Sequence, residues 1–234
     1  MINGTASSLG ILFDLDGTLI DSVYQHVLAW HQALREDGIE LSVWRIHRRV
    51  GMSGGLFVDA LARETGVTVD VARSQRLQRR HAEELLARLA EIRPLPGAIP
   101  LLDALDDSGV PYAIATSGRR ETADHTLRLL RLRPGVPIVT RDDVAHAKPD
   151  PDLFLAAADR LGLPADACYV VGDSVWDLLA AQRARALGIG VLSGGYGRGE
   201  LERAGAYRVY ADPADMLAHL DEIGIRRRPL AADL

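Results

Sequence analysis

The sequence is poor in the features that mark secreted and membrane proteins. It has one cysteine, Cys168, so no disulfide can form within the chain. No apolar run approaches the about 20 residues of a membrane span, and residues 1–8 show neither the basic nor the apolar region of a secretory signal. We therefore expect a cytoplasmic protein with no membrane partner. We expect a buried, structural thiol at Cys168, because an apolar strand follows it.

The chain also lacks an excess of positive charge, and among its basic residues it has almost no lysine. Its 27 Lys and Arg are outnumbered by 32 Asp and Glu, which gives a formal net charge of −5. A basic surface is the usual mark of nucleic-acid binding, so we expect no nucleic-acid partner. Lys148 is the one lysine, beside 26 arginines. Because a planar guanidinium does not reproduce a compact ammonium, Lys148 is a candidate functional residue.

The remaining composition is that of a globular protein with a full core. Of 234 residues, 47% are hydrophobic and 25% charged, which suits one large domain or one domain with an insertion. A buried strand is predicted at residues 9–13. Helices are then predicted at 22–38, 43–50, 56–65 and 70–89, up to the helix-breaking segment 93–97.

Beyond residue 97 the pattern changes to alternating helices and strands. Strands are predicted at 112–115, 138–139, 169–171, 189–192 and 208–210, with helices at 98–107, 121–130, 151–161, 176–187 and 213–220. This alternation is typical of a doubly wound parallel sheet. We therefore predict an α/β protein with a Rossmann-like core, residues 1–19 and 95–234, and an inserted all-helical cap domain, residues 20–94.

Polar segments directly follow four of the predicted strands. They are Asp14-Leu-Asp16-Gly-Thr18, Thr116-Ser117-Gly118, Lys148-Pro-Asp-Pro and Gly172-Asp173-Ser-Val-Trp-Asp177. The strands of one parallel sheet share a carboxyl edge, where ligands bind, so all four segments can meet in one crevice. Each segment alone could be a helix cap or a surface charge. All four in this order favour an active site.

These motifs resemble those of the haloacid dehalogenase-like hydrolase superfamily, in the phosphatase branch with a helical cap. The resemblance implies that Asp14 attacks phosphorus to form an aspartyl-phosphate. It implies that Asp16 protonates the leaving oxygen and then deprotonates the hydrolytic water. Mg²⁺ would be held by Asp14, the backbone carbonyl of Asp16 and Asp173, with Asp177 in support.

The same resemblance assigns the phosphate contacts. Thr116 and the Ser117 amide would hold the phosphoryl oxygens, with Gly118 and Arg119 beside them, and Lys148 would pair with Asp14 and the phosphate. This agrees with elementary chemistry, because a carboxylate can attack a phosphate dianion only where cations neutralise both, and Mg²⁺ prefers such oxygen ligands.

Asp16 must carry a proton in the first step, although the pKa of a free aspartate is about 3.9. We expect burial under the cap, or a neighbouring anion, to raise the pKa of this carboxyl.

Substrate selection is expected in the cap. The segment Asp21-Ser-Val-Tyr-Gln-His26 resembles the first cap helix of β-phosphoglucomutase-like proteins, where a histidine approaches the acid/base aspartate. The loop at residues 50–55 resembles the specificity loop of that group. The candidate cap residues for substrate binding are His26, Gly51, Met52 and Ser53, and the candidates for a second anion are Arg48, Arg49 and Arg119.

The expected activity is that of a Mg²⁺-dependent phosphatase acting on a small phosphorylated metabolite, as a monomer or homodimer. Dehalogenases of the superfamily lack the second aspartate that Asp16 supplies, and phosphonoacetaldehyde hydrolases need a cap lysine that is absent here. The first alternative is a sugar-phosphate mutase, against which Gly54 and Gly172 count, since mutases carry an arginine and an acidic residue there. The second is a non-hydrolytic phospho-aspartate switch or binding protein.

Overall fold

The computed structural model describes residues 9–226. Residues 1–8, which bear on the expected absence of a secretory signal, lie outside this range. The strands are β1 (Gly10–Phe13), β2 (Ile20–Asp21), β3 (Arg93–Pro94), β4 (Tyr112–Ala115), β5 (Ile138–Val139), β6 (Cys168–Gly172), β7 (Leu187–Val191) and β8 (Ala206–Tyr210). The helices are α1 (Val23–Glu36), α2 (Val43–His47), α3 (Gly54–Thr65), α4 (Val71–Leu86), α5 (Ala98–Ser108), α6 (Arg120–Leu127), α7 (Asp152–Leu161), α8 (Val175–Ala184), α9 (Arg198–Arg203) and α10 (Pro213–Ala218).

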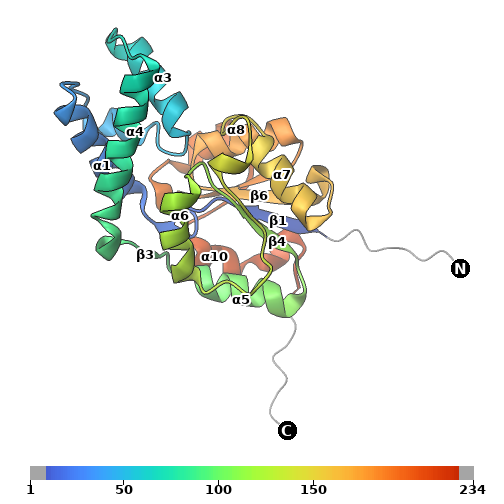
Figure 1. Ribbon diagram of the computed structural model, residues 1–234. Helices are drawn as coiled ribbons and strands as arrows, with labels where there is room; N and C mark the ends of the chain where they lie inside the picture. Colours follow the sequence, from blue (N-terminus) through green and yellow to red (C-terminus); the bar gives the residue numbers. More distant parts are fainter. Residues whose placement is uncertain (1–8, 227–234) are drawn as a thin grey trace, which may run out of the picture.

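Six strands form one parallel sheet in the order β5-β4-β1-β6-β7-β8. Side chains alternate along a strand, so Ile11 and Phe13 of β1 pack with α5, α6 and α10, whereas Leu12 packs with α7 and α8 on the other face. Figure 1 shows these helices on opposite sides of the sheet. Burial on both faces explains the continuous apolar run of β1. The predicted burial of Cys168 is confirmed.

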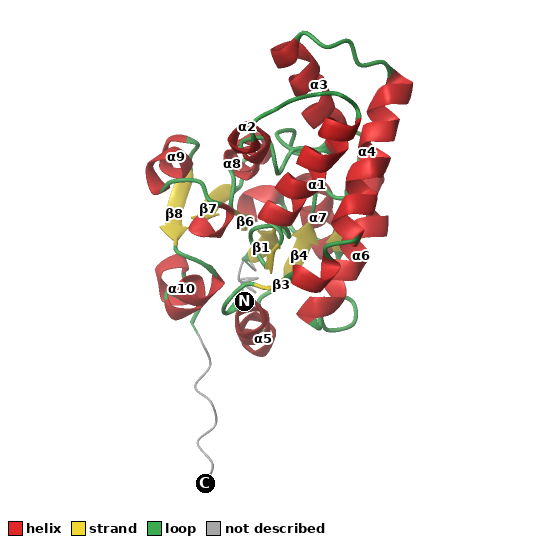
Figure 2. Ribbon diagram, turned by 90° about the vertical axis from the view of Figure 1, so that its left-hand side faces the viewer, coloured by secondary structure: helices red, strands yellow, loops and turns green. Residues whose placement is uncertain are grey.

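Helices α1–α4 form a cap with a hydrophobic core of its own, which includes Trp30, Leu34, Phe57 and Leu77. In Figures 1 and 2, α1 and α4 lie side by side, away from the sheet. The chain enters the cap through β2 and leaves it through β3, and these two strands pair antiparallel. The predicted Rossmann-like core with an inserted helical cap is therefore confirmed, while the predicted domain limits at residues 20 and 94 stay a prediction.

Several elements differ from the sequence prediction, among them the short strands β2 and β3, which were not predicted. Helix α9 was not predicted, because Leu201 is its one buried residue and leaves no apolar periodicity. Helix α3 begins at Gly54 rather than at the predicted residue 56, because the Ser53 hydroxyl accepts from the Leu56 amide at 3.5 Å and caps the helix.

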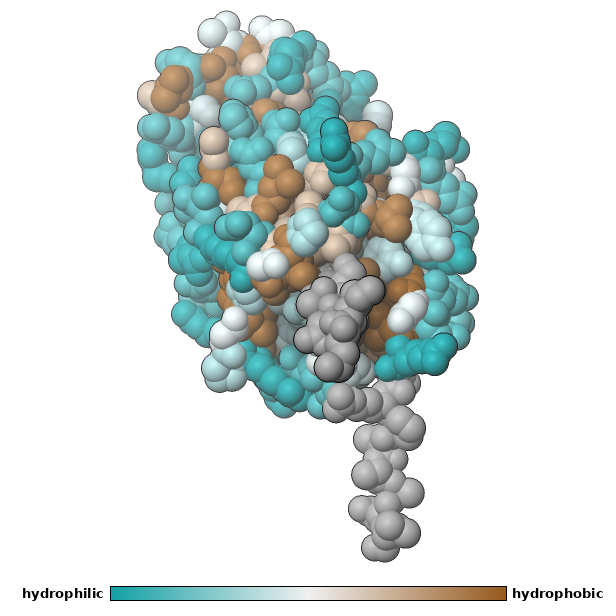
Figure 3. Space-filling view, turned by 90° about the vertical axis from the view of Figure 1, so that its right-hand side faces the viewer, coloured by the Kyte–Doolittle hydropathy of each residue, from teal (hydrophilic) through white to brown (hydrophobic). Residues whose placement is uncertain are grey.

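In Figure 3, hydrophobic residues lie in patches across the middle of the face, and hydrophilic residues surround them. Across residues 9–226, none of the helices combines the length and apolar character needed to cross a membrane.

Candidate active site

The four polar segments meet at the carboxyl edge of four adjacent strands, β5, β4, β1 and β6. Asp14 follows β1 directly, Thr116 follows β4 and Asp173 follows β6. Lys148 belongs to the segment that follows β5, and its side chain contacts Asp14. The four motifs are far apart in the sequence but form one cluster in the structure, because neighbouring parallel strands end at the same edge of the sheet.

Lys148 is a fully buried charged group at the centre of this cluster. Its side chain has no exposed surface, and its Nζ forms ion pairs with Asp14 Oδ1 and, at 2.7 Å, with Asp177 Oδ1. The Phe154 ring lies 5.2 Å from the Nζ. Burial alone would lower the pKa of Lys148, but the two carboxylates raise it above the ordinary lysine value. Lys148 is therefore a permanent buried cation beside Asp14.

Three buried carboxylates surround this single ammonium group. Asp14, Asp173 and Asp177 each place an oxygen atom within 4.8 Å of the other two. With Lys148 charged, three ionised carboxylates would leave the cluster two negative charges in excess. Burial, together with the neighbouring carboxylates, raises the pKa of Asp14 to about 7 despite Lys148, and raises the pKa of Asp173 well above its ordinary value. The cluster is thus short of positive charge.

The geometry around Asp173 suits a small, hard cation. Carboxylate oxygens are the ligands that divalent hard cations prefer, and two positive charges would neutralise the excess. A Cβ atom at Gly194 would lie 1.6 Å from Asp173 Oδ2, and one at Gly17 would lie 2.6 Å from it. Glycine at both positions therefore lets two loops close around this carboxylate. Thr18 Oγ1 donates to its other oxygen at 3.3 Å.

Asp177 differs from its two partners because its Oδ2 accepts two hydrogen bonds from the start of α8, whereas its Oδ1 forms an ion pair without a hydrogen bond among the described residues. Oδ1 pairs with Lys148, and Oδ2 accepts from the Ser174 amide at 3.1 Å and the Ser174 hydroxyl at 2.5 Å. This capping arrangement at the start of α8 holds Asp177 in one orientation. Asp14 and Asp173 are therefore the better candidates for direct metal ligation, with Asp177 behind them.

Asp16 is held by the first residues of the cap. Its Oδ1 accepts from Ser22 Oγ at 2.6 Å and lies 3.3 Å from His26 Nε2, while Thr116 Oγ1 lies 3.5 Å from Oδ2. The expectation that burial under the cap leaves the pKa of this carboxyl raised is wrong. Burial does raise it, but the His26 charge and the hydrogen bonds from His26 and Ser22 outweigh burial and lower the pKa of Asp16 to about 2.

His26 contacts a second histidine, His81, which the sequence did not single out. His26 Nδ1 lies 3.1 Å from Nε2 of His81 on α4, and the His81 ring stacks on Trp30 with centroids 4.3 Å apart. Burial and the His26 charge lower the pKa of His81 well below its ordinary value, so this ring is neutral. Two residues that lie 55 positions apart and meet only in the folded protein leave no local signal in the sequence.

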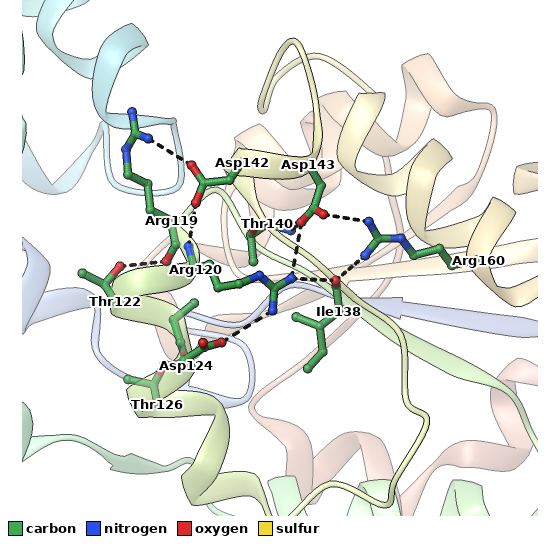
Figure 4. Close-up of polar contacts among 11 residues, drawn as sticks. Arg119, Arg120, Thr122, Asp124, Thr126, Ile138, Thr140, Asp142, Asp143 and Arg160 are labelled. Atoms are coloured by element: carbon green, nitrogen blue, oxygen red, sulfur yellow. Dashed lines mark hydrogen bonds and ion pairs between the residues drawn. The ribbon is translucent and has the colours of Figure 1, made fainter.

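The turn after β4 offers a hydrogen-bonding site. The Gly118 amide donates to Thr116 Oγ1 at 3.0 Å, and the threonine hydroxyl donates to Asp16 Oδ2 at 3.5 Å. Ser117 Oγ is buried and has no hydrogen-bond partner among residues 9–226. Because buried hydroxyls are normally paired, this one indicates a missing ligand. Arg119 contributes little here, since its side chain is 62% exposed and pairs with Asp142 at 3.0 Å (Figure 4).

The cap loop closes the other side of a pocket of about 470 Å³, which Gly51, Met52 and Ser53 line together with Asp14, Asp16, His26, Thr116, Ser117, Gly118 and Arg119. A Cβ atom at Gly51 would lie 2.9 Å from Ser174 Oγ, so the loop sits directly on the start of α8. All four predicted cap residues therefore reach the pocket.

The arginines proposed for a second anion already have acidic partners. Arg48 pairs with Glu200 and lies over the Tyr196 ring, 4.0 Å from its centroid. Arg49 pairs with Glu64. Arg48 thus connects the cap to Glu200 on α9 and to Tyr196 in the loop before that helix.

A parallel sheet with this cluster at its carboxyl edge, under an inserted helical cap, defines a class of capped hydrolases. Residues 9–185 match the family model of the haloacid dehalogenase-like hydrolases, and because that range is most of the chain and includes all four motifs, the protein belongs to this family.

Similar proteins with known names narrow the classification from hydrolases to phosphatases. The phosphoglycolate phosphatase of Rhodospirillum rubrum is 34% identical over 213 residues, 88% of each chain. Hexitol phosphatase A of Escherichia coli is 33% identical over 177 residues, 75% of this chain and 79% of that one. A crystal structure of a hydrolase from Pseudomonas syringae is 54% identical, with a TM-score of 0.90 over 92% of this chain and 99% of the other. The protein is an enzyme, a phosphoric monoester hydrolase of this superfamily.

Proposed function

We propose that this enzyme is a Mg²⁺-dependent phosphatase that hydrolyses a small phosphate monoester through an aspartyl-phosphate formed on Asp14. The observation that carries the proposal is the buried ion pair of Asp14 with Lys148, set among two further carboxylates and open to a pocket of about 470 Å³. In this proposal residues 20–94 form the cap that covers the pocket. The cytoplasmic location and the monomeric or dimeric state stay predictions.

In the first step Asp14 attacks phosphorus. Lys148 offsets the repulsion between the carboxylate and the phosphate dianion, and Mg²⁺ held by Asp14, the Asp16 carbonyl and Asp173, with Asp177 in support, would supply the remaining charge neutralisation. Thr116 and Ser117 would hold the phosphoryl oxygens, and the unpaired Ser117 hydroxyl supports this role. Phosphoryl transfer depends mainly on such positioning and charge stabilisation.

The low pKa of Asp16 in the free enzyme fits the second step better than the first. Its ionised form can take a proton from the water that hydrolyses the aspartyl-phosphate. For the first step Asp16 needs a proton, and the negative charge of a bound phosphate beside it would raise its pKa. The substrate itself would thus prepare the general acid, and transfer of that proton to the leaving oxygen would leave Asp16 ionised as the general base, with His26 beside it.

The mutase alternative is less well supported. A Cβ atom at Gly172 would lie 2.3 Å from Asp177 Cγ, so an acidic residue there would displace Asp177. Arg48 and Arg49, the cap candidates for a second phosphate, each pair with a glutamate. A phospho-aspartate switch would need neither Asp16 nor a cap.

The test is phosphate release from sugar phosphates, phosphoglycolate and nucleotides, with and without Mg²⁺. Wild-type enzyme should release phosphate from at least one ester with Mg²⁺, and the Asp14→Asn variant should release none. Conversion of β-glucose 1-phosphate to the 6-phosphate without release from any ester would establish the mutase instead. Release by Asp14→Asn would refute the nucleophile assignment.

A further inference from the structure

Helix α4 is heavily charged except on the face that lines the pocket. Its charged residues are Arg73, Arg76, Arg79, Arg80, Glu83 and Glu84. Its pocket-lining residues are Val71, Ser74, Gln75, Gln78, His81 and Ala82, none of which carries a charged side chain when His81 is neutral. Their spacing of three and four residues is that of one helix face. A strip of neutral polar groups thus faces the space beyond Asp16.

The polar atoms of this strip are available for a ligand. Gln78 Nε2 donates to Ser74 Oγ at 3.1 Å, while Gln78 Oε1 has no hydrogen-bond donor among the described residues. A Cβ atom at Gly54 would lie 3.2 Å from Gln78 Oε1, so this oxygen sits over the cap loop. His81 uses Nε2 for His26, and its Nδ1 has no partner within residues 9–226.

The charged groups that line the rest of the pocket leave little free positive charge. Besides Asp14, Asp16 and His26, which faces Asp16, they are three arginines and three acids, namely Arg49, Arg119, Arg141, Asp59, Asp70 and Glu121. Arg49 and Arg119 pair with Glu64 and Asp142. Figure 4 shows Arg119 bonded to Asp142, and Arg120 turned to Asp124 and Asp143.

Arg141 is the exception among these arginines. It donates to the Val144 carbonyl at 2.6 Å and has no carboxylate partner in the described part of the chain. A leaving group with its own carboxylate would have to bury that charge with one cation at most, and burying an unpaired charge is strongly unfavourable.

We infer that Ser74, Gln78 and His81 form the leaving-group subsite, and that it selects a neutral, polyhydroxylated leaving group over a carboxylated one. The inference rests on the proposed phosphatase function. Hydroxyl groups both donate and accept, so an open-chain or cyclic polyol can pair with the carbonyl oxygen, hydroxyl and ring nitrogen of the strip. The pocket, about 470 Å³, is of the size that holds a hexose-like ligand.

The test compares D-glucitol 6-phosphate with 6-phosphogluconate, which differ only in a terminal hydroxymethyl or carboxylate, and uses p-nitrophenyl phosphate as a third substrate. Wild-type kcat/KM should favour glucitol 6-phosphate by about tenfold or more. Gln78→Leu should lower the ratio of kcat/KM for glucitol 6-phosphate to that for p-nitrophenyl phosphate by about tenfold, mainly through KM. Gln78→Arg should raise the relative kcat/KM for 6-phosphogluconate. Arg79→Gln, exposed on the same helix, is the matched control and should leave both ratios unchanged.

Three results would overturn the inference while leaving the phosphatase intact. One is a wild-type kcat/KM for 6-phosphogluconate equal to or above that for glucitol 6-phosphate. Another is a set of substrate ratios unmoved by both Gln78 variants. The third is loss of 6-phosphogluconate hydrolysis alone in Arg141→Gln, which would place the selective contact at Arg141. Failure to release phosphate even from p-nitrophenyl phosphate would overturn the phosphatase proposal and this inference together.

Discussion

Replacement of Lys148 by methionine should damage both folding and catalysis. The side chain is fully buried, and its Nζ lies 2.7 Å from Asp177 Oδ1 and pairs also with Asp14. At an effective dielectric constant of about 20, one ion pair at this separation has a Coulomb energy of about 6 kcal/mol before desolvation is counted. Removing one partner of a buried pair typically costs about 3–5 kcal/mol, because the other charge stays buried and uncompensated. We therefore expect Lys148→Met to lower the free energy of unfolding by about 3–5 kcal/mol.

The metal should change the size of this effect. Without Lys148 the cluster of Asp14, Asp173 and Asp177 would have no internal cation to offset its ionised carboxylates. A divalent cation would then offset part of the repulsion, so the stability difference from wild type should be smaller in Mg²⁺ than in EDTA. The kcat for phosphate release should fall by about 10²–10³-fold even at saturating Mg²⁺, because one preorganised positive charge at the reacting phosphate is lost.

Lys148→Arg is the informative control in a chain with 26 arginines. A planar guanidinium is bulkier than an ammonium and has no exposed space here, with the Phe154 ring 5.2 Å from the Nζ. Its kcat should therefore stay near that of Lys148→Met although the charge is kept. Urea unfolding in EDTA and in Mg²⁺, with phosphate release at saturating substrate, measures each quantity. A Lys148→Met enzyme within about 1 kcal/mol of wild type and of equal kcat would refute the charge argument. A fully active Lys148→Arg enzyme would refute the argument from shape.

Three further predictions concern the loops around the site. Arg48→Ala removes the ion pair between cap and core and should raise KM severalfold, with a stability loss of at most about 1 kcal/mol because the pair is over a third exposed; an unchanged KM in steady-state assays would speak against this link. Gly194→Ala places a Cβ against Asp173 and should weaken Mg²⁺ activation by about tenfold or more, read from a Mg²⁺ titration of activity, where a wild-type midpoint would contradict the packing. Asp143→Asn should lower the free energy of unfolding at pH 7 by about 1 kcal/mol. Burial raises the pKa of Asp143, but hydrogen bonds with Arg160 and the preceding turn outweigh burial and hold it below its unfolded value. The stability it contributes is therefore present above about pH 4 and lost as pH falls, and denaturation curves at pH 7 and pH 3 that differ from wild type by the same amount would count against it.

The sequence was sufficient for the fold class and for the convergence of the four motifs, because both follow from local rules. Apolar strands alternate with helices, and a residue placed directly after a parallel strand reaches the common edge. Asp14, Thr116 and Asp173 are such residues. Helix α9 and the strands that link the cap to the core could not be predicted in the same way, since they are short and their residues follow no periodic pattern.

The pKa of Asp16 and the partner of His26 lay beyond sequence reasoning for a different reason. The shift of this pKa is the balance of two effects. Burial raises the pKa, and the contacts with His26 and Ser22 lower it by more. The direction of the shift depends on the distances from Asp16 Oδ1 to Ser22 Oγ, 2.6 Å, and to His26 Nε2, 3.3 Å, which are set by the packing of the cap. His81 belongs to another helix, and its contact with His26 arises from how α1 and α4 pack.

In the proposed mechanism, these contacts would link proton transfer by Asp16 to recognition of the leaving group by helix α4. Asp16 is bonded to the first turn of the cap by Ser22 and His26, and His26 is supported from α4 by His81. The same face of α4 presents Gln78 and Ser74 to the pocket. A leaving group bound to this face of α4 therefore contacts the same helix that orients His26 through His81. A movement of α4 that spoils the subsite must also disturb the pair of histidines behind Asp16. Discrimination between leaving groups should accordingly appear in kcat as well as in KM when α4 is displaced as a whole, and mainly in KM when a single hydrogen bond of the strip is removed.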